Sequence, residues 1–154
     1  MNAQWSLQFL AFRSDESTAH YPKMTASELL KRYAAGERYF SKIDLSHENL
    51  SQVNLTGINL SRAILCWVLG RKAILQGANF YGANLTQAVL TSADLHGANL
   101  CEANLSGADL RDADLSGANL TRANLSNANL RHANLSQTIL PDGAIGKRQL
   151  DFYR

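Results

Sequence analysis

Cysteine and proline are both scarce in this chain, with two residues of each among 154. Cys66 and Cys101 follow Leu65 and Leu100, which we expect to lie on different sides of the molecule, so a disulfide between them is not expected. Reduced thiols and a cytoplasmic location are the corresponding expectation. No apolar run approaches the roughly 20 residues of a membrane span. The first residues also lack the basic, apolar and small-residue pattern of a secretion signal.

An excess of charge of either sign is missing as well. Fifteen lysines and arginines face thirteen aspartates and glutamates, which leaves a formal charge of +2. This balance argues against a strongly acidic mimic of nucleic acid, and it gives little support to a general nucleic-acid binder. The length fits one domain that buries a continuous core.

What the chain does have is a five-residue repeat from Ser41 to Leu140. It comprises twenty consecutive blocks, and a large apolar residue closes all but one of them, as in Gly-Ala-Asn-Leu at 97–100 and Arg-Ala-Asn-Leu at 122–125. Leucines five apart would scatter around an α-helix and would alternate between the two faces of a strand. They share one core only if the backbone turns a corner once per block, so each block is one short side of a tube.

Glycine and asparagine indicate how many sides make a turn, because both recur every twenty residues in the same phase. The glycines are Gly57, Gly77, Gly97 and Gly117, and the asparagines are Asn59, Asn79, Asn99 and Asn119. Glycine suits a corner that needs a positive φ, and asparagine can hydrogen-bond its own turn. The pattern predicts about five four-sided coils, stacked at the spacing of neighbouring strands, about 4.8 Å.

The blocks resemble the pentapeptide-repeat family, whose consensus is approximately A-[D/N]-L-x-x. Ala-Asn-Leu at 83–85 and 133–135 and Ala-Asp-Leu at 93–95 match it, and the resemblance covers about two thirds of the chain. It implies an all-β solenoid, a right-handed quadrilateral β-helix, in which the leucine and the alanine two residues before it point inward. The chain looks like a cyanobacterial-type member with an N-terminal capping helix. The resemblance implies a scaffold that binds other proteins, and many members of the family have no assigned activity.

Residues 1–24 do not repeat and are expected to form an N-terminal arm. Trp5, Leu7 and Phe9 alternate with polar residues, as in a short strand. We expect the arm to lie on the first coil. A flexible tail and an over-extended reading frame, with Met24 as the true start, are the alternatives.

Residues 25–40 are predicted to form a capping helix and the lead-in to the repeat. The helix is expected from Thr25 to Ala35, because Thr25 and Glu28 have capping-box spacing and Gly36 is a good stop. We expect it to cover the open end of the first coil rather than to bind a partner. After the repeat domain at 41–140, residues 141–154 are expected to form a C-terminal tail or cap. In it, Leu150, Phe152 and Tyr153 would shield the last coil or a dimer contact.

Two irregularities interrupt the inward positions. Glu48 stands where later blocks have alanine, and because a buried lone carboxylate is costly, we expect that corner to open to solvent or to the cap. Gly70 stands where a large core residue is expected. Either Leu69 slips inward through a bulge, which we favour, or a neighbour fills the gap.

Two sets of outward residues are candidates for an interaction surface. The apolar set would be an interface or would be covered by Trp5, Phe9 and Phe12 of the arm, and we favour the arm. It comprises Ile64, Trp67, Leu69, Ile74 and Val89. The basic set would contact an acidic partner or phosphate, or it is ordinary solubilising charge, which we favour. It comprises Arg71, Lys72, Arg111 and Arg131.

Residues for catalysis, metal binding or cofactor binding are not evident. His47, His96 and His132 are expected on three different sides, and no serine is placed with a histidine and a carboxylate that would activate it. We therefore predict a non-enzymatic scaffold that binds an unknown protein partner and no membrane. The alternatives are a DNA-mimic protector of a type II topoisomerase, disfavoured by the balanced charge, and a weak nucleic-acid binder through the basic face. A homodimer through one end of the solenoid is a further expectation.

Overall fold

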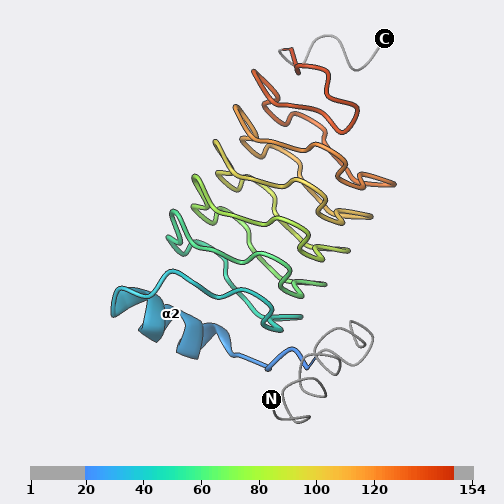
Figure 1. Ribbon diagram of the computed structural model, residues 1–154. Helices are drawn as coiled ribbons and strands as arrows, with labels where there is room; N and C mark the ends of the chain where they lie inside the picture. The colour runs from blue at the N-terminus through green and yellow to red at the C-terminus, as the bar shows by residue number, and fades with distance from the viewer. Residues whose placement is uncertain (1–19, 148–154) are drawn as a thin grey trace, which may run out of the picture.

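The repeat winds into a four-sided tube of stacked coils (Figure 1), as seen in a computed structural model that describes residues 20–147. Parallel bridges join each side to the one twenty residues later, for example Asp44 to Ile64 and Ile64 to Asn84. Each block contributes one such bridge residue, and residues 20–147 contain no longer strand. The predicted period of four blocks per turn is therefore confirmed.

The four sides can be identified by their central inward residues, each column being spaced by twenty. The first side contains Leu45, Leu65, Leu85, Leu105 and Leu125. The second side contains Leu50, Gly70, Leu90, Leu110 and Leu130. The third side contains Leu55, Leu75, Leu95, Leu115 and Leu135. The fourth side contains Phe40, Leu60, Phe80, Leu100, Leu120 and Leu140. Sides one and three, and sides two and four, therefore face each other across the tube.

Corners form because the second residue of every block has a left-handed backbone. In all twenty blocks its φ lies between 56° and 69°, although only six of these residues are glycine. At one corner the Leu55 carbonyl accepts a hydrogen bond from the Ile58 amide at 3.1 Å, which closes a tight turn with Gly57 at its third position. Asparagine fixes the next corner, where Asn59 Oδ1 accepts from the Ser61 amide at 3.0 Å. The predicted roles of glycine and asparagine are both observed.

The core consists of the central leucines and the alanines two residues before them. Leu100 and Ala98 are typical, being 0 % and 1 % exposed. Because successive coils place a large side chain and, in most blocks, an alanine at the same two inward positions, their layers stack directly. Residues 41–140 thereby bury a continuous apolar column, with a single bridge residue in each block.

The expected bulge at Leu69 is not present, and that prediction was wrong. Leu69 makes the regular bridges to Asn49 and Val89, and it remains 41 % exposed. Hydrogen bonds hold this register, from the Leu69 amide to the Glu48 carbonyl at 2.9 Å and from the Gly70 amide to the Val89 carbonyl at 2.7 Å. A bulge would disrupt these ladder bonds. The alternative holds instead: a Cβ on Gly70 would lie 2.8 Å from Leu90 Cδ2, so a neighbour occupies the space.

One helix, α2, covers the N-terminal end of the tube and spans Ala26–Ala34. Thr25 caps it by accepting a hydrogen bond from the Glu28 amide at 3.2 Å, as the capping-box spacing predicted. Its Leu29 is fully buried against the first coil. On either side of the helix, the Met24 amide bonds the Asp44 carbonyl and Tyr39 bridges to Asn59. The helix thus replaces two sides of a coil (Figure 1).

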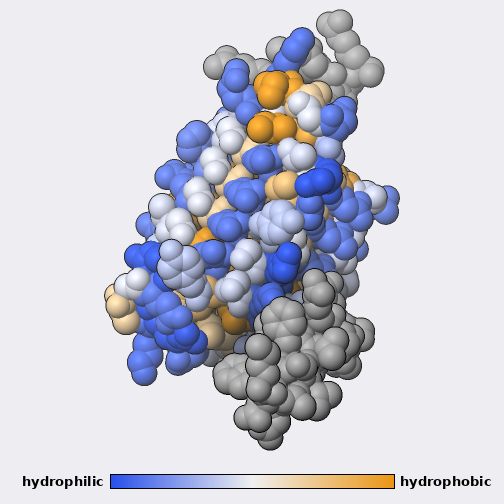
Figure 2. Space-filling view, in the orientation of Figure 1, coloured by the Kyte–Doolittle hydropathy of each residue, from blue (hydrophilic) through white to orange (hydrophobic). Residues whose placement is uncertain are grey.

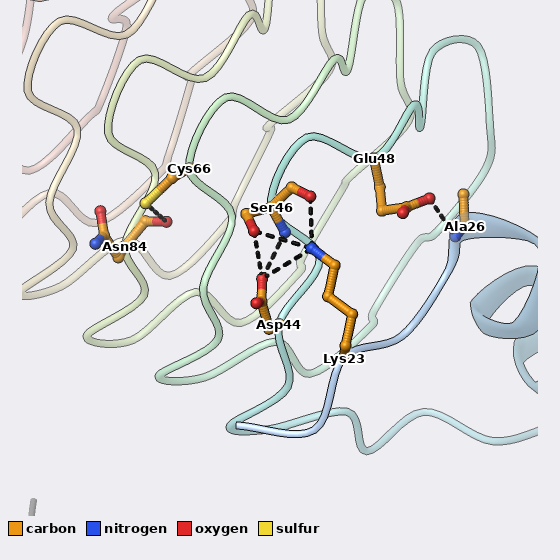
Figure 3. A network of polar contacts seen from close by, with 7 residues as sticks. All are labelled: Lys23, Ala26, Asp44, Ser46, Glu48, Cys66 and Asn84. Atoms are coloured by element: carbon orange, nitrogen blue, oxygen red, sulfur yellow. Dashed lines mark hydrogen bonds and ion pairs between the residues drawn. The ribbon is translucent and has the colours of Figure 1, made fainter. Parts of the chain in front are cut away.

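Polar contacts fasten this cap to the first coil (Figure 3). Glu48 Oε2 accepts a hydrogen bond from the Ala26 amide at 2.8 Å, so its carboxylate lies at the positive N-terminal end of α2, and the corner opens to the cap as expected. Lys23 Nζ donates to the Ser46 carbonyl at 2.8 Å and lies 3.4 Å from Asp44 Oδ1. Partial burial would raise the pKa of Asp44, but hydrogen bonds from Ser46 and the charge of Lys23 outweigh it and lower that pKa.

After the repeat, the chain turns back at Gly143, whose φ is 87°, and pairs antiparallel through Ile139 and Ile145. The Leu140 amide donates to the Ala144 carbonyl at 2.8 Å, so this hairpin covers the end of the fourth side. The expectations for residues 1–19 of the predicted arm at 1–24, and for Leu150, Phe152 and Tyr153, lie outside the described residues. The domain boundaries remain predictions.

Candidate interaction surface

The predicted apolar set is distributed over three sides of the tube. Ile64, Leu69 and Ile74 are outward bridge residues of the first, second and third sides of one coil. Val89 lies beside Leu69, its bridge partner on the second side. Trp67 is at the corner between the first and second sides. The structure therefore brings Trp67, Leu69 and Val89 together, and it separates Ile64 and Ile74 from them.

Trp67 and Leu69 are the most exposed of these residues, at 53 % and 41 %. The indole is parallel to the imidazole of His47 in the preceding coil, with an interplanar angle of 3° and ring centroids 6.5 Å apart. Gln87 occupies the same corner position in the next coil, and Val89 is half-buried. These residues form a small apolar projection beside the polar side chains of Asn49 and Gln87. We call Trp67, Leu69 and Val89 the Trp67 surface.

The predicted basic residues line the corner between the second and third sides. Arg71 and Lys72 are exposed next to the Trp67 surface, and Arg71 Nη1 donates to Thr91 Oγ1 at 3.3 Å. Arg111, two coils further on, binds Asp109 through Nε–Oδ1 at 2.9 Å and Nη2–Oδ2 at 2.7 Å.

This ion pair neutralises the middle of the basic column. The hydrogen bonds from Arg111 lower the pKa of Asp109, so its carboxylate remains charged beside the guanidinium. Arg131 lies a further twenty residues along the same corner. The positive charge is therefore divided between Arg71 and Lys72 near one end and Arg131 near the other.

A groove that the sequence analysis missed lies at the corner between the fourth and first sides. Its volume is about 440 Å³. It is lined by Tyr21, Arg62, Ala63, Ile64, Tyr81, Gly82, Asn84 and Glu102. The available signal was Gly82, a residue without a side chain in a corner column that otherwise carries long charged side chains. Only Ile64 of this groove was among the predicted site residues.

Within residues 20–147 no group of three or more His, Cys, Asp and Glu side chains could hold a metal ion. Cys66 and Cys101 are both free and half-buried, and burial raises the pKa of the Cys66 thiol.

The helix α2 has nine residues, and the described part of the chain offers no helix with the length and apolar character of a membrane span. Figure 2 shows one flank of the tube, largely hydrophilic, with hydrophobic groups gathered towards the C-terminal end.

Solved structures similar to this chain are pentapeptide repeat proteins. One, from the cyanobacterium Cyanothece 51142, is 29 % identical over 77 % of this chain and 97 % of that chain, with a TM-score of 0.59. Another, from the thylakoid lumen of Arabidopsis thaliana, is 29 % identical over 71 % of this chain and 73 % of that chain, with a TM-score of 0.52. A third, from Nostoc Pcc 7120, is 36 % identical over 77 % of this chain and 81 % of that chain, with a TM-score of 0.45.

Comparison with curated proteins finds no match. The model of the family described as pentapeptide repeats matches residues 49–87, 71–107 and 103–140, which together make up more than half of the chain. The matched region lies within the four-sided tube described above, and the fold is the right-handed quadrilateral β-helix of these proteins. The chain therefore belongs to the pentapeptide repeat family.

Proposed function

We propose that this protein is a non-enzymatic, cytoplasmic scaffold that binds a protein partner through the Trp67 surface. The observation that carries the proposal is the exposure of Trp67 and Leu69, at 53 % and 41 %, on neighbouring positions of a hydrogen-bonded coil. Exposed aromatic residues are common binding anchors, because they bury much area and lose little conformational entropy. The free thiols of Cys66 and Cys101 support the cytoplasmic location.

The partner that fits best carries apolar side chains next to acidic ones. Arg71 and Lys72 are exposed and flank the Trp67 surface on its third-side edge. Acidic groups on the partner would be attracted to these cations, which favours a specific orientation and a faster encounter. Ile64 and Ile74 lie on other sides and are peripheral to this contact, and Arg111 is held by Asp109.

The test replaces the apolar projection with residues that the repeat already uses. In Trp67→Gln with Leu69→Asn, glutamine is the residue of Gln87 in the same corner column, and asparagine is that of Asn49 in the same outward column. The coil should therefore fold normally. A tagged full-length protein is cross-linked gently in native lysate, and captured proteins are identified by mass spectrometry.

The expected result is a protein partner captured by the natural sequence and lost in the double variant. Gly97→Gln is the matched control, since it adds a glutamine at a corner with positive φ on another part of the tube. The proposal fails if the double variant captures the same proteins as the natural sequence, or if neither captures any protein under gentle conditions. Weaker retention of Arg71→Ala with Lys72→Ala would confirm the acidic character of the partner.

The nucleic-acid alternatives are less well supported. The net charge of +2 does not produce the acidic rod expected of a DNA mimic that protects a topoisomerase, and the Arg111–Asp109 pair interrupts the basic column. Salt-sensitive retention on heparin that Arg111→Ala with Arg131→Ala abolishes would reverse this ranking.

A homodimer through the C-terminal end is the second arrangement that we propose. Leu125 and Leu130, which end the first and second sides, are only partly buried. Their amides donate to no backbone carbonyl within residues 20–147. This end of the five proposed coils therefore offers backbone groups for pairing, while α2 covers the opposite end. Sedimentation of the full chain over a range of concentrations tests the dimer, and a monomer at all concentrations would exclude it.

A further inference from the structure

The groove at the corner between the fourth and first sides exists because one corner residue has no side chain. The second residues of successive blocks along this corner all have positive φ and are Lys42, Arg62, Gly82, Glu102 and Arg122. Gly82 leaves a gap between two long charged side chains, and a Cβ there would lie 3.4 Å from Arg62 Cγ. The resulting volume of about 440 Å³ is within the size range of small-molecule sites.

The walls of the groove combine apolar and aromatic surface. Ile64 is the one apolar residue in an outward column that otherwise contains Asp44, Asn84, Asn104 and Asn124. Tyr21 comes from the segment before α2, and Tyr81 directly precedes Gly82 in the corner. An apolar or aromatic ligand group therefore has an isoleucine side chain and two phenol rings to pack against.

The negative charge in the groove is already satisfied. Tyr81 donates its hydroxyl hydrogen to Glu102 Oε2 at 2.8 Å. Arg122 Nη2 lies 2.5 Å from the other carboxylate oxygen of Glu102. The hydrogen bond to Glu102 also raises the pKa of Tyr81, which keeps the phenol protonated as a donor. Glu102 therefore does not attract a further cation strongly.

The remaining polar groups in the groove are donors. The guanidinium of Arg62 lies over the ring of Tyr81, 5.9 Å from its centroid, and pairs with no carboxylate among residues 20–147. Asn84 Oδ1 accepts from the amide and the hydroxyl of Thr86, at 3.1 and 2.6 Å. The amide nitrogen of Asn84 donates to no side chain or carbonyl in the described part of the chain. Beside the apolar wall, Arg62 thus offers a cation that interacts with Tyr81 but with no carboxylate of the described residues, and Asn84 offers one amide donor.

We propose that this groove binds the carboxylate of an organic acid that carries an apolar or aromatic group. Arg62 would hold the carboxylate in a charge-assisted hydrogen bond, and Asn84 would donate a second one. The apolar group would pack on Ile64 between Tyr21 and Tyr81. The carboxylate belongs either to a free small acid or to the C-terminus of a peptide. This site is on a different corner from the Trp67 surface, so it does not depend on the proposed scaffold function.

The test uses the full-length protein labelled with ¹⁵N and follows the backbone amides by NMR. The probes are 2-naphthoate and its neutral counterpart 2-naphthamide. Shifts at the Ile64 and Gly82 amides with 2-naphthoate, and much smaller ones with 2-naphthamide, are the expected result. A short peptide ending in phenylalanine, with a free or an amidated C-terminus, distinguishes the two sources of the carboxylate.

Two variants localise the binding. Gly82→Gln fills the groove, and Gln52, Gln87 and Gln137 already adopt the same positive φ, so the corner should keep its fold. Gly77→Gln is the matched control, because nothing lies within 4 Å of a Cβ at that corner. We expect Gly82→Gln and Arg62→Gln to weaken 2-naphthoate binding by about tenfold or more, and Gly77→Gln to leave it unchanged. Equal binding of the acid and the amide, no shifts at either amide, or equal loss in the control would overturn the proposal.

Discussion

Gly70 and Phe80 lie opposite each other in the same coil, one with no side chain and the other with the largest central side chain of residues 61–80. They are ten residues apart, which places them on the second and fourth sides. Both line a residual apolar cavity of only about 20 Å³, and Phe80 is 2 % exposed. The extra volume of the phenyl ring, together with Leu90, therefore offsets the missing leucine at position 70.

This relationship predicts strong coupling between the two positions. Gly70→Leu alone should destabilise the protein by about 1–3 kcal/mol through overpacking against Leu90. Phe80→Leu alone should cost roughly 1–2 kcal/mol by enlarging the cavity. The double variant restores a regular leucine layer. Its loss of unfolding free energy should therefore be smaller than the sum of the two single losses by at least about 1 kcal/mol. Urea unfolding of the four proteins measures this coupling.

The control for that cycle pairs Gly70→Leu with Phe40→Leu. Phe40 is on the same side as Phe80 but two coils away. When two substitutions are far apart, the losses in unfolding free energy that they cause add to within about 0.5 kcal/mol. Additivity in the Phe80 cycle as well would contradict the proposed compensation.

The carboxylate of Glu48 is predicted to stabilise α2. Glu48→Ala removes the acceptor of the Ala26 amide and the negative charge at the helix N-terminus, and should cost about 1 kcal/mol. Glu48→Gln keeps an acceptor and should cost less. Hydrogen exchange of the α2 amides, together with thermal unfolding, measures both effects. Unchanged protection of α2 in Glu48→Ala would show that the contact contributes nothing.

The lowered pKa of Asp44 predicts a pH-dependent contribution to stability. Because the folded pKa lies below the unfolded value, the charged carboxylate, which accepts hydrogen bonds from Ser46 and pairs with Lys23, stabilises the fold above the unfolded pKa, about 3.9. That contribution is lost as the pH falls through the folded pKa. Since Lys23 is 54 % exposed, the gain is at most about 1 kcal/mol.

Asp44→Asn isolates this charge, because Asn84 and Asn104 occupy the same outward column and support the same turn. The variant should be less stable than the natural protein at neutral pH and equally stable in acid below the folded pKa. Asp112→Asn, at an exposed corner, is the control. A stability difference that persists at low pH would refute the explanation by the charge of Asp44.

The left-handed backbone at the corners predicts that introducing a glycine there and removing one have opposite effects on stability. At Gly77 φ is 62° and a Cβ would meet nothing within 4 Å, so Gly77→Ala tests backbone strain alone and should cost about 1 kcal/mol. At Ser92 φ is 57° with an exposed side chain. Ser92→Gly should relieve strain, partly offset by greater freedom of the unfolded chain. Thermal melts of both variants check the two signs.

The tube could be predicted from the sequence because its determinants are local and repeated. A leucine every fifth residue requires one corner per block, and the twenty-residue spacing of Gly57 and Gly77 sets four sides. The helix could be predicted for the same kind of reason, since Thr25 and Glu28 interact within one turn. In each case the residues that determine the structure are close together in sequence or repeat with a fixed period.

The remaining features depend on side-chain contacts that the repeat does not specify. Whether Leu90 fills the space at Gly70 is decided by side-chain conformation in the next coil. The pairing of Arg111 with Asp109 removes a cation that composition alone counts as free. The groove at Gly82 also depends on Tyr81 and Glu102 meeting across a coil boundary, a contact that Gly82 alone does not indicate.

The twenty-residue bridge spacing has a consequence for insertions and deletions. Removing a single block would preserve the five-residue spacing of the leucines and therefore the core. Every outward residue after the deletion would nevertheless move by a quarter turn onto the neighbouring side. Removing four blocks would shorten the tube and leave each remaining residue on its original side. The surface of such a protein can therefore be rearranged in discrete rotations by changes in length, without any substitution.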